Sequence, residues 1–359
     1  MSFVSPYERL QAIGLTPQLL SSLPFPLPGG DAALMRVAEV QRDGLVLHDG
    51  ESTWSARARP ALIQALASQA DALAVGDWVR AERNTFGEWW VDARVPPRTQ
   101  LARRLHDGRE KVERVVLASN VDTALLVMGL DHDFNLRRLE RYLALVRLAG
   151  VGAVVVLSKA DLCVDLGRRL RDAQTLAPAG VEVLALDSLH DDVAAQLAPW
   201  LAPGQTLVLL GSSGAGKSTL ANALCGEAVA ATGGTRRGDG RGRHTTTART
   251  LHPLPGGACI VDTPGLRSLR LDGDAGDVAG AFDDIAALAA QCRFRDCRHE
   301  GEPGCAVRGT VAPERLKSFG KLVREAQRDS MSALQRREQV AQWKARSRIG
   351  RANIRAKRG

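Results

Sequence analysis

A glycine-rich stretch in the second half of the chain has the composition of a phosphate-binding loop. It matches the pattern GxxxxGK[ST], follows the apolar run 205–210 and opens the helical run 218–225. The motif requires this strand–loop–helix context, because glycines let consecutive backbone N–H groups surround phosphates and the start of the helix adds positive potential. The residues expected to contact a nucleotide here are Gly211, Ser212, Ser213, Gly214, Ala215, Gly216, Lys217, Ser218 and Thr219.

A second segment, DTPG, is expected to complete this site. Lys217 would reach the β- and γ-phosphates and act in catalysis, and the Ser218 hydroxyl would bind Mg²⁺. Asp262 directly follows the apolar run 258–261, so its carboxylate can also act on Mg²⁺, while the Gly265 amide can face the γ-phosphate. DTPG by itself is a common turn, and its significance comes from its pairing with the glycine-rich loop.

Residues 238–247, GDGRGRHTTT, lie between these two segments and have the features of a switch. A glycine-rich loop that ends in three threonines suits a segment that the γ-phosphate and Mg²⁺ bring into order. One of Thr245, Thr246 and Thr247 is expected to be the second hydroxyl ligand of Mg²⁺, and Thr246 is the candidate we assign. The alternative is a disordered RNA-binding loop, and both descriptions can hold at different stages of one cycle.

A candidate base-reading segment lies earlier in the chain. Ser158, Lys159, Ala160 and Asp161 directly follow the apolar run 151–157 and match [NTS]KxD. Asp161 can accept hydrogen bonds from the N1–H and 2-amino groups of guanine, a pattern of donors that adenine lacks, and the aliphatic stem of Lys159 would cover the base. So short a motif is common by chance, but its place after a strand and before a helix strengthens the prediction.

The order of the motifs is unusual, because the guanine reader precedes the phosphate loop. A parallel sheet tolerates this order if the original termini are joined and new ones open in a surface loop. The loop at Asp187 and Ser188, after the apolar run 181–186, is a further candidate for backbone contact with the base. In this order the switch leads directly into the C-terminal region, so nucleotide state can move that region.

Three cysteines and one histidine lie close together near the C-terminal end. Three thiolates and one imidazole complete a tetrahedral structural zinc site with no open position for catalysis. The alternative is that two of the cysteines are simply buried thiols, as we expect for Cys163, Cys225 and Cys259. The predicted zinc ligands are Cys292, Cys297, His299 and Cys305. The interleaved basic residues, suited to a nucleic-acid backbone, are Arg293, Arg295, Arg298 and Arg308.

The elements that must position these motifs divide the chain into five parts. Residues 1–32 form an N-terminal arm, and residues 33–100 contain five short strands typical of an OB-fold β-barrel, although an SH3-like barrel gives a similar pattern. Residues 101–275 alternate apolar runs with amphipathic helices, which predicts a parallel α/β sheet and a circularly permuted P-loop GTPase domain. Residues 276–345 predict a mainly helical zinc-binding domain, and residues 346–359 a basic, disordered tail.

Composition limits the class of protein. The 359 residues are 45% hydrophobic and 25% charged, as in ordinary globular proteins, and no apolar run is long enough to span a bilayer. The first residues lack a signal-peptide pattern, so we expect a cytoplasmic protein without a membrane partner. The net charge of +8 indicates a polyanionic partner. The basic residues after Ala341, where no acidic residue follows, are Lys344, Arg346, Arg348, Arg351, Arg355, Lys357 and Arg358.

Together these features resemble the ribosome small-subunit-dependent GTPase family, RsgA or YjeQ, among the circularly permuted GTPases. The resemblance runs from Ala33 to Arg328 and depends on SKAD, GSSGAGKST, GRHTTT, DTPG and the Cys/His cluster, in that order. It implies an OB-fold, a permuted GTPase core that binds GTP and GDP with magnesium, and a domain with one structural zinc ion. It also implies binding to the small ribosomal subunit and its rRNA, hydrolysis stimulated by the subunit, and a role in its late maturation.

Two residues depart from the usual GTPase pattern. Ser158 stands where Asn is usual, and this change is expected to remove an amide that braces the phosphate loop, while Asp161 keeps the choice of base. Leu266 follows DTPG where many GTPases have a catalytic Gln, a replacement that the family shares. The resemblance therefore implies that another residue positions the attacking water. His244 is the matching candidate, and we expect slow hydrolysis until the ribosome orders the switch.

Two other functions fit parts of the pattern. A P-loop ATPase or kinase would share the phosphate loop, but the chain shows no domain for an acceptor substrate, and Asp161 favours guanine. An RNA-binding protein with a structural nucleotide would keep the motifs, but small subunits would not accelerate its hydrolysis of GTP. We place GTP hydrolysis first and expect a monomer.

Overall fold

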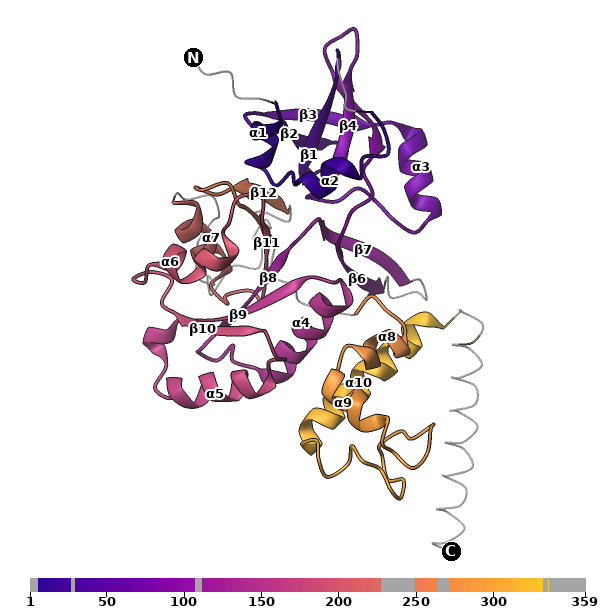
Figure 1. The fold of residues 1–359 in the computed structure, drawn as a ribbon, viewed down its shortest axis with the longest axis vertical. Helices are drawn as coiled ribbons and strands as arrows, with labels where there is room; N and C mark the ends of the chain where they lie inside the picture. The colour runs from indigo at the N-terminus through magenta and orange to yellow at the C-terminus, as the bar shows by residue number, and fades with distance from the viewer. Residues whose placement is uncertain are drawn as a thin grey trace, which may run out of the picture. The chain divides into compact units, whose positions relative to one another are not determined.

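The computed structural model describes residues 6–26, 30–106, 112–226, 249–263, 271–331 and 335 (Figure 1). The chain divides into two compact units. One comprises Met1–Arg103 and Arg114–Leu269, and the other Arg104–Glu113 and Arg270–Gly359. Among the described residues, no helix combines the length and the apolar character that crossing a bilayer requires. The expected switch loop and basic tail lie outside the described residues.

The first unit begins with two short helices, α1 (Pro6–Gln11) and α2 (Pro17–Ser21). The Thr16 hydroxyl caps α2 by accepting the N–H of Leu19 at 3.3 Å, which satisfies one of the free amides at the start of the helix. Ile13, between the helices, is fully buried, and Leu19 is nearly so. The segment before the first strand is therefore packed against the unit by its apolar side chains.

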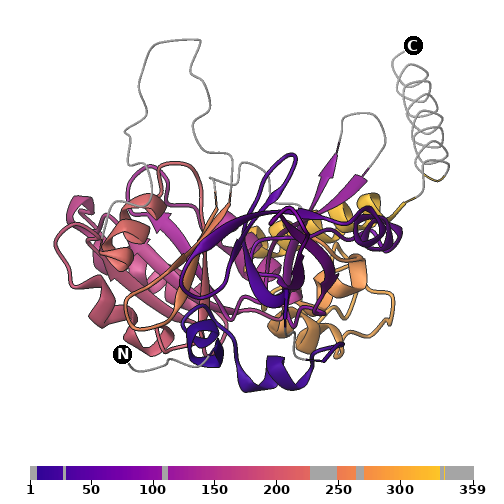
Figure 2. The ribbon, with the colours of Figure 1, turned by 90° about the horizontal axis from the view of Figure 1, so that it is seen from above.

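A closed five-stranded barrel follows (Figure 2). Its strands pair in the order β1-β2-β3-β5-β4-β1, and every pairing is antiparallel except the parallel one between β3 and β5. The predicted OB-like barrel is thereby confirmed. Its elements are β1 (Ala32–Val40), β2 (Leu45–His48), β3 (Thr53–Ala58), α3 (Pro60–Ser68), β4 (Trp78–Arg83) and β5 (Trp89–Arg94). Alternate residues fill its core, namely Met35, Val37, Leu45, Leu47, Ala56, Val79, Ala81 and Val91.

The predicted α/β sheet is also confirmed. Five of its strands are parallel, and the sixth, β12, is antiparallel to β13 at the edge. The strand order is β10-β9-β8-β11-β13-β12, with the strand that precedes the phosphate loop in the interior. The strands are β8 (Thr123–Gly129), β9 (Gly152–Ser158), β10 (Glu182–Leu186), β11 (Thr206–Leu210), β12 (Thr250–Pro253) and β13 (Cys259–Asp262).

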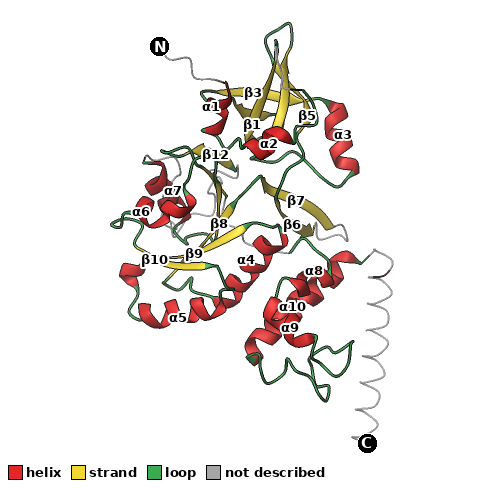
Figure 3. Ribbon diagram, in the orientation of Figure 1, coloured by secondary structure: helices red, strands yellow, loops and turns green. Residues whose placement is uncertain are grey.

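Helices cover both faces of this sheet, with α4 and α5 on one side and α6 and α7 on the other (Figure 3). The Asn135 side chain caps α4 by accepting the N–H of Arg138 at 3.1 Å. Side chains of β8, β9 and β11 are almost fully buried, as expected of parallel strands with both faces covered. The helices are α4 (Leu136–Leu148), α5 (Leu166–Leu176), α6 (Val193–Leu197) and α7 (Lys217–Cys225).

In the sequence, two further strands lie between the barrel and the α/β sheet. β6 (Gln100–His106) and β7 (Val112–Ser119) pair as a two-stranded sheet. Basic residues fill much of this stretch, so its strand pattern is weaker than that of the apolar runs. A separate link joins the barrel to the α/β sheet, because Glu39 of β1 pairs with Thr250 of β12.

Arg36, on β1, is a fully buried cation at this junction. Its guanidinium donates to the carbonyls of Ile13, Gly76 and Asn120 and, at 2.9 Å, to the hydroxyl of Thr206 at the start of β11. Burial lowers the pKa of Arg36, and these acceptors compensate for lost hydration. One side chain therefore connects the N-terminal segment, the barrel and the strand that leads to the phosphate loop.

The second unit is mainly helical, as predicted. Its helices are α8 (Ala275–Gly280), α9 (Asp283–Ala289) and α10 (Pro313–Ser330). The rings of Phe282 and Phe319 meet edge to face, 5.2 Å apart, and pack α10 against the shorter helices. Between α9 and α10 the chain forms an irregular loop that carries the Cys/His cluster.

Asp77, directly before β4, is a buried carboxyl in the first unit. Its Oδ2 accepts the N–H of Ala74 at 2.8 Å, and the Arg94 guanidinium lies 3.8 Å away. Desolvation outweighs these partners and raises the pKa of Asp77 to about 6. The folded state therefore binds this proton more tightly than the unfolded state. The resulting stability is fully present below the ordinary pKa of 3.8 and is lost as pH rises through about 6.

Replacing Asp77 with Asn should remove this pH dependence while keeping an acceptor for the Ala74 amide. Relative to Asp77→Asn, the free energy of unfolding of the wild type should fall by about 2 kcal/mol between about pH 4.5 and about pH 7.5. Urea unfolding of both proteins at the two pH values measures this difference. Equal changes in the two proteins would show that Asp77 titrates as an ordinary carboxyl.

Candidate functional site

The candidate nucleotide site lies where the parallel strands of the α/β sheet end. β8 pairs with β9 up to Gly129 and Ser158, and with β11 up to Leu126 and Leu210. The loops that follow these strands therefore start at one edge of the sheet. This edge is formed by the carboxyl ends of the strands. Open α/β sheets bind ligands there, at the point where the connections from neighbouring strands lead in opposite directions.

The phosphate loop has the backbone that its glycines predict. A Cβ on Gly211 would lie 2.4 Å from the Val127 carbonyl oxygen, so only glycine fits beside β8. Gly214 and Gly216 have φ angles of +83° and +94°, in the left-handed region that favours glycine. Helix α7 begins at Lys217, directly after this loop, so its amino-terminal end faces the loop.

Lys217 lies inside the loop. Its side chain is only 7% exposed, and Nζ donates to the carbonyls of Gly211 and Ser212 at 3.1 and 2.8 Å. Burial lowers the pKa of Lys217, and the charges of Asp262 and Asp133 oppose that shift. Ser218 and Thr219 occupy the first turn of α7, half-buried. The lysine is thus held as a desolvated cation at the start of a helix, an arrangement that favours an anion.

Asp262 ends β13, beside the phosphate loop. Burial raises the pKa of its carboxyl, and the nearby Lys217 cation opposes the shift. The next residue, Thr263, is buried and donates its hydroxyl to the Leu209 carbonyl of β11, which fixes the end of β13. Gly265, Leu266, His244 and Thr246 lie outside the described residues.

The base-reading segment contacts the phosphate loop directly. The buried Ser158 hydroxyl donates to the Ala215 carbonyl at 2.6 Å. Lys159, in the left-handed region at φ +60°, donates through Nζ to the Gly214 carbonyl at 2.7 Å. Ser158 lacks the amide that usually braces this loop, as the sequence indicates. A hydroxyl on the shorter side chain reaches a loop carbonyl and replaces the amide.

Asp161 lies beyond these contacts, in the 3₁₀ turn Ala160–Leu162, with an exposed side chain. Because Leu186 pairs with Ser158, the loop after β10 starts beside this turn. The Ser188 hydroxyl oxygen is buried and has no hydrogen-bond partner among the described residues. These two segments, separate in sequence, therefore flank one position next to the phosphate loop.

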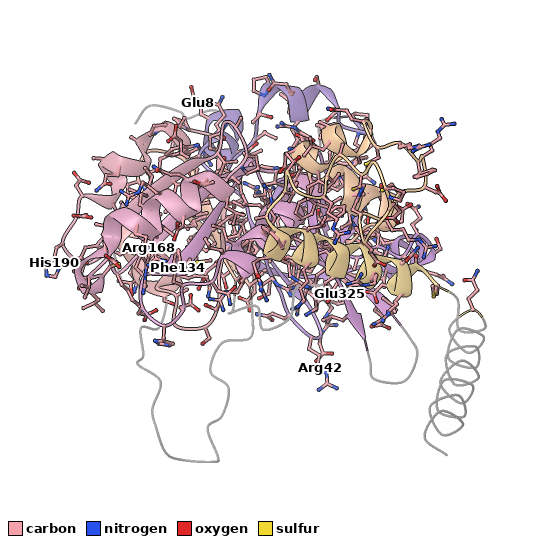
Figure 4. The ribbon with its side chains drawn as sticks, turned by 90° about the horizontal axis from the view of Figure 1, so that it is seen from below. Glu8, Arg42, Phe134, Arg168, His190 and Glu325 are labelled. Atoms are coloured by element: carbon pink, nitrogen blue, oxygen red, sulfur yellow. The ribbon has the colours of Figure 1, made fainter. Side chains whose placement is uncertain are left out.

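The loop after β10 is held by its own acidic side chains. The Asp191 carboxylate accepts the N–H of Asp187 at 2.7 Å, and Asp187 accepts the N–H of Leu189 at 3.0 Å. The hydrogen bond from the Leu189 amide lowers the pKa of Asp187. The contact between Asp187 Oδ2 and His190 Nδ1, at 2.6 Å, lowers it further. The His190 ring itself points outward to solvent (Figure 4).

The structure adds two candidate site residues that motif matching missed, Asp131 and Asp133 in the loop after β8. The Asp131 carboxylate is 2.8 Å from Lys159 Nζ. The Asp133 carboxylate accepts the Ser212 hydroxyl at 2.5 Å. Acidic residues at the end of a parallel strand are a usable signal, because neighbouring strands bring their ends together, but DHD matches no nucleotide motif.

The four predicted zinc ligands come together in the second unit. Their ligand atoms all lie within 4.8 Å of one another. His299 Nδ1 is 3.7 Å from Cys292 Sγ and 3.4 Å from Cys305 Sγ, and the two sulfurs are 4.0 Å apart. That sulfur separation is far from the disulfide length of about 2 Å and close to the value of about 3.8 Å expected for two thiolates on one zinc ion.

The loop around the cluster is held by backbone donors. The Arg308 N–H donates to Cys305 Sγ at 3.3 Å. The Glu302 carboxylate accepts the N–H groups of Arg298, Glu300 and Gly301, each at 3.0 Å. These amides, that of Gly301 foremost, lower the pKa of Glu302 to about 2. The donor set and its spacing can therefore hold a structural zinc ion.

Comparison with known proteins identifies the family. The profile of the RsgA GTPase family matches residues 95–272. A "Small ribosomal subunit biogenesis GTPase RsgA" of Xylella fastidiosa is 43% identical over 334 residues, which cover 88% of this chain and 93% of that protein.

Two solved structures share the fold. YjeQ from Thermotoga maritima has a TM-score of 0.60 at 21% identity and covers 82% of this chain and 98% of its own. YloQ, described as a circularly permuted GTPase, has a TM-score of 0.56 at 22% identity and covers 82% and 95%. With its permuted sheet order and its phosphate loop, this chain belongs to the RsgA GTPase family and is a GTP-hydrolysing enzyme.

Proposed function

We propose that the chain binds GTP and GDP at the edge of its α/β sheet and hydrolyses GTP during biogenesis of the small ribosomal subunit. The observation that supports this most is the pair of contacts from Ser158 to Ala215 and from Lys159 to Gly214. They hold Ser158 and Lys159 against the phosphate loop, which supports a base site next to the phosphate site. The names of the relatives supply the biological process.

On the base side, Asp161 would accept the N1–H and 2-amino groups of guanine. The Lys159 stem, fixed at its ammonium end by the Gly214 carbonyl, would cover the base. The loop at Asp187 and Ser188 would contribute backbone contacts, and the buried Ser188 hydroxyl would gain a partner there. Adenine lacks the donors that Asp161 requires, which disfavours the alternative of an ATPase or kinase.

On the phosphate side, the amides of the loop and the first turn of α7 would surround the phosphates. The Lys217 ammonium, which donates to loop carbonyls, would turn to the β- and γ-phosphates. Gly265 would contribute its amide to the γ-phosphate. The nine loop residues in this role are Gly211, Ser212, Ser213, Gly214, Ala215, Gly216, Lys217, Ser218 and Thr219.

The residues that would hold Mg²⁺ are Ser218, Thr246 and Asp262. Hydroxyl and carboxylate oxygens are the ligands that Mg²⁺ prefers, and Asp262 and Ser218 both border Lys217, so the donor set fits. The ion, bound with the nucleotide, neutralises phosphate charge. The chain's own tasks are then to hold the γ-phosphate with Lys217 and to position water with His244, since Leu266 has no polar group for it.

The partner we propose is the small subunit and its rRNA. On the barrel, the Arg83 guanidinium lies over the rings of Trp54 and Trp89, at 5.7 and 5.6 Å, and Phe86 beside them is 87% exposed. Aromatic faces next to a cation suit unpaired bases and phosphates. A hollow of about 490 Å³ adjoins Trp89 and includes Arg42, which extends into solvent (Figure 4). Ribosome assembly would place the enzyme, as a monomer, in the cytoplasm.

Stimulation by the small subunit tests this proposal. Purified small subunits should raise the rate of GTP hydrolysis by the wild type. His244→Ala should lose about 100-fold of the stimulated rate, as expected when a water-positioning group is removed. Multiple-turnover phosphate release with GTP, with and without subunits, measures both effects.

The control is Gln174→Ala, which removes an exposed polar side chain of α5 outside the proposed site and should keep the stimulation. If His244→Ala is stimulated like the wild type, the histidine assignment is wrong. If the wild type hydrolyses GTP equally fast without subunits, the subunit is not its activator.

We also propose that Cys292, Cys297, His299 and Cys305 hold one structural zinc ion. Cys297→Ser should lower the zinc content from one ion per chain to almost none and make the second unit sensitive to protease, because metal binding and folding are coupled in such modules. GDP affinity should stay unchanged, since the cluster and the nucleotide site lie in different units.

Atomic absorption and limited proteolysis measure these effects, with Cys163→Ser as the control for loss of a thiol outside the cluster. A Cys297→Ser protein with full zinc content and unchanged cleavage would contradict the assignment.

A further inference from the structure

The loop after β8 contacts both halves of the proposed nucleotide site. Asp131 reaches the base-reading segment through Lys159 Nζ, at 2.8 Å. Asp133 reaches the phosphate loop through the Ser212 hydroxyl, at 2.5 Å. The two residues are linked, because the backbone N–H of Asp133 donates to Asp131 Oδ1 at 2.9 Å.

The loop is itself held in place from two helices. Arg138, in the first turn of α4, contacts the Asp133 carboxylate and carbonyl. Arg169 of α5 donates to the carbonyls of Leu130 and Asp131 at 2.7 and 3.2 Å. Both carboxylates therefore project from a turn anchored by two arginines that belong to the same sheet domain.

The sequence at this turn allows little variation. A Cβ on Gly129 would lie 2.8 Å from Asp131 Oδ1, so glycine is required for the carboxylate to take this position. The Gly129 N–H also donates to Asp133 Oδ2 at 3.3 Å. Arg169 further packs over the Phe134 ring, 5.2 Å from its centre. The turn is thus shaped to present two acidic groups at the end of β8.

Electrostatics alone would not place carboxylates here. Phosphates carry negative charge, so an acidic side chain beside their loop repels the ligand. Each carboxylate instead accepts from protein donors: Lys159 and the Asp133 amide for Asp131, and Ser212 and the Gly129 amide for Asp133. Partial burial tends to raise the pKa of Asp131, but the bond from Lys159 lowers it, so this carboxylate is ionised near neutral pH.

We propose that Asp131 and Asp133 are positioning residues for guanine-nucleotide binding, Asp131 for the base through Lys159 and Asp133 for the phosphates through Ser212. The Lys159 ammonium is shared between Asp131 and the Gly214 carbonyl, so two acceptors fix the far end of its stem. The Ser212 carbonyl accepts from Lys217, so fixing Ser212 also fixes the partner of that lysine. The inference depends on the nucleotide site proposed above.

Alanine and asparagine variants separate positioning from charge. Asp131→Ala and Asp133→Ala remove the acceptor, and each should weaken GDP binding about 10-fold, the effect of losing a hydrogen bond to a charged group. Asp131→Asn and Asp133→Asn keep one acceptor oxygen and should retain most of the affinity. If the carboxylates act only by their charge, all four variants should bind GDP more tightly than the wild type, because repulsion is removed.

A competitor without a base separates the two roles. The Kd of tripolyphosphate can be obtained from its competition with fluorescent GDP. This Kd should be the same for Asp131→Ala as for the wild type. It should be about 10-fold higher for Asp133→Ala. In hydrolysis, Asp131→Ala should raise KM and leave kcat almost unchanged, because Lys159 contacts the base end. Asp172→Ala, which removes a half-buried carboxylate of α5 outside the proposed site, is the control and should match the wild type.

Thermal unfolding without nucleotide shows whether each variant is folded, and the asparagine variants keep the test valid if an alanine variant is not. Failure of the wild type to bind GDP would overturn the proposed site itself. Normal binding by the wild type and by both alanine variants would overturn only the positioning roles.

Discussion

The parallel register of β9, β8 and β11 is the constraint on which the site depends. Because these neighbouring strands run in one direction, the residues after each of them meet at one edge. Ser158 therefore contacts Ala215, although the two residues are 57 positions apart in the sequence. The order in which the chain supplies the strands does not affect this meeting. Permutation changes which loops carry the connections and leaves the site's geometry intact.

The same register explains why polar side chains concentrate at this edge. Ser158, Lys159 and Asp133 all contact the phosphate loop or its immediate neighbours, and each follows a strand whose own side chains are buried. Rigid strands therefore fix the base-reading segment, the phosphate loop and the acidic turn relative to one another. At the opposite end of β11, Arg36 bonds Thr206 and connects this sheet to the barrel.

Much of this could be predicted from the sequence, because the signals are local. GxxxxGK[ST] needs only its strand, glycines and helix, and the four predicted zinc ligands lie within one loop. The alternation of apolar residues predicted the barrel, and the apolar runs predicted the parallel sheet. Each of these patterns reflects a physical requirement that repeats along the chain.

The remaining features depend on contacts between distant segments. Arg36 in a barrel strand looks like a surface cation, and only the folded chain shows the acceptors that allow its burial. The contact from Ser158 to Ala215 could not be predicted, because hydroxyl reach depends on how closely β9 approaches the loop. β6 and β7 were missed because charged residues interrupt their apolar pattern and surround the turn between them. Asp131 and Asp133 belong to no motif and are explained only by the neighbours that β8 brings them.

The most direct test of the central claim is base specificity measured through Asp161. Xanthine has a carbonyl where guanine has its 2-amino group, so an asparagine amide at this position should donate to it. The ratio of kcat/KM for GTP to that for XTP should favour GTP in the wild type and fall by about 100-fold or more in Asp161→Asn. An unchanged ratio would show that Asp161 does not read the base of the nucleotide whose phosphates bind at Lys217.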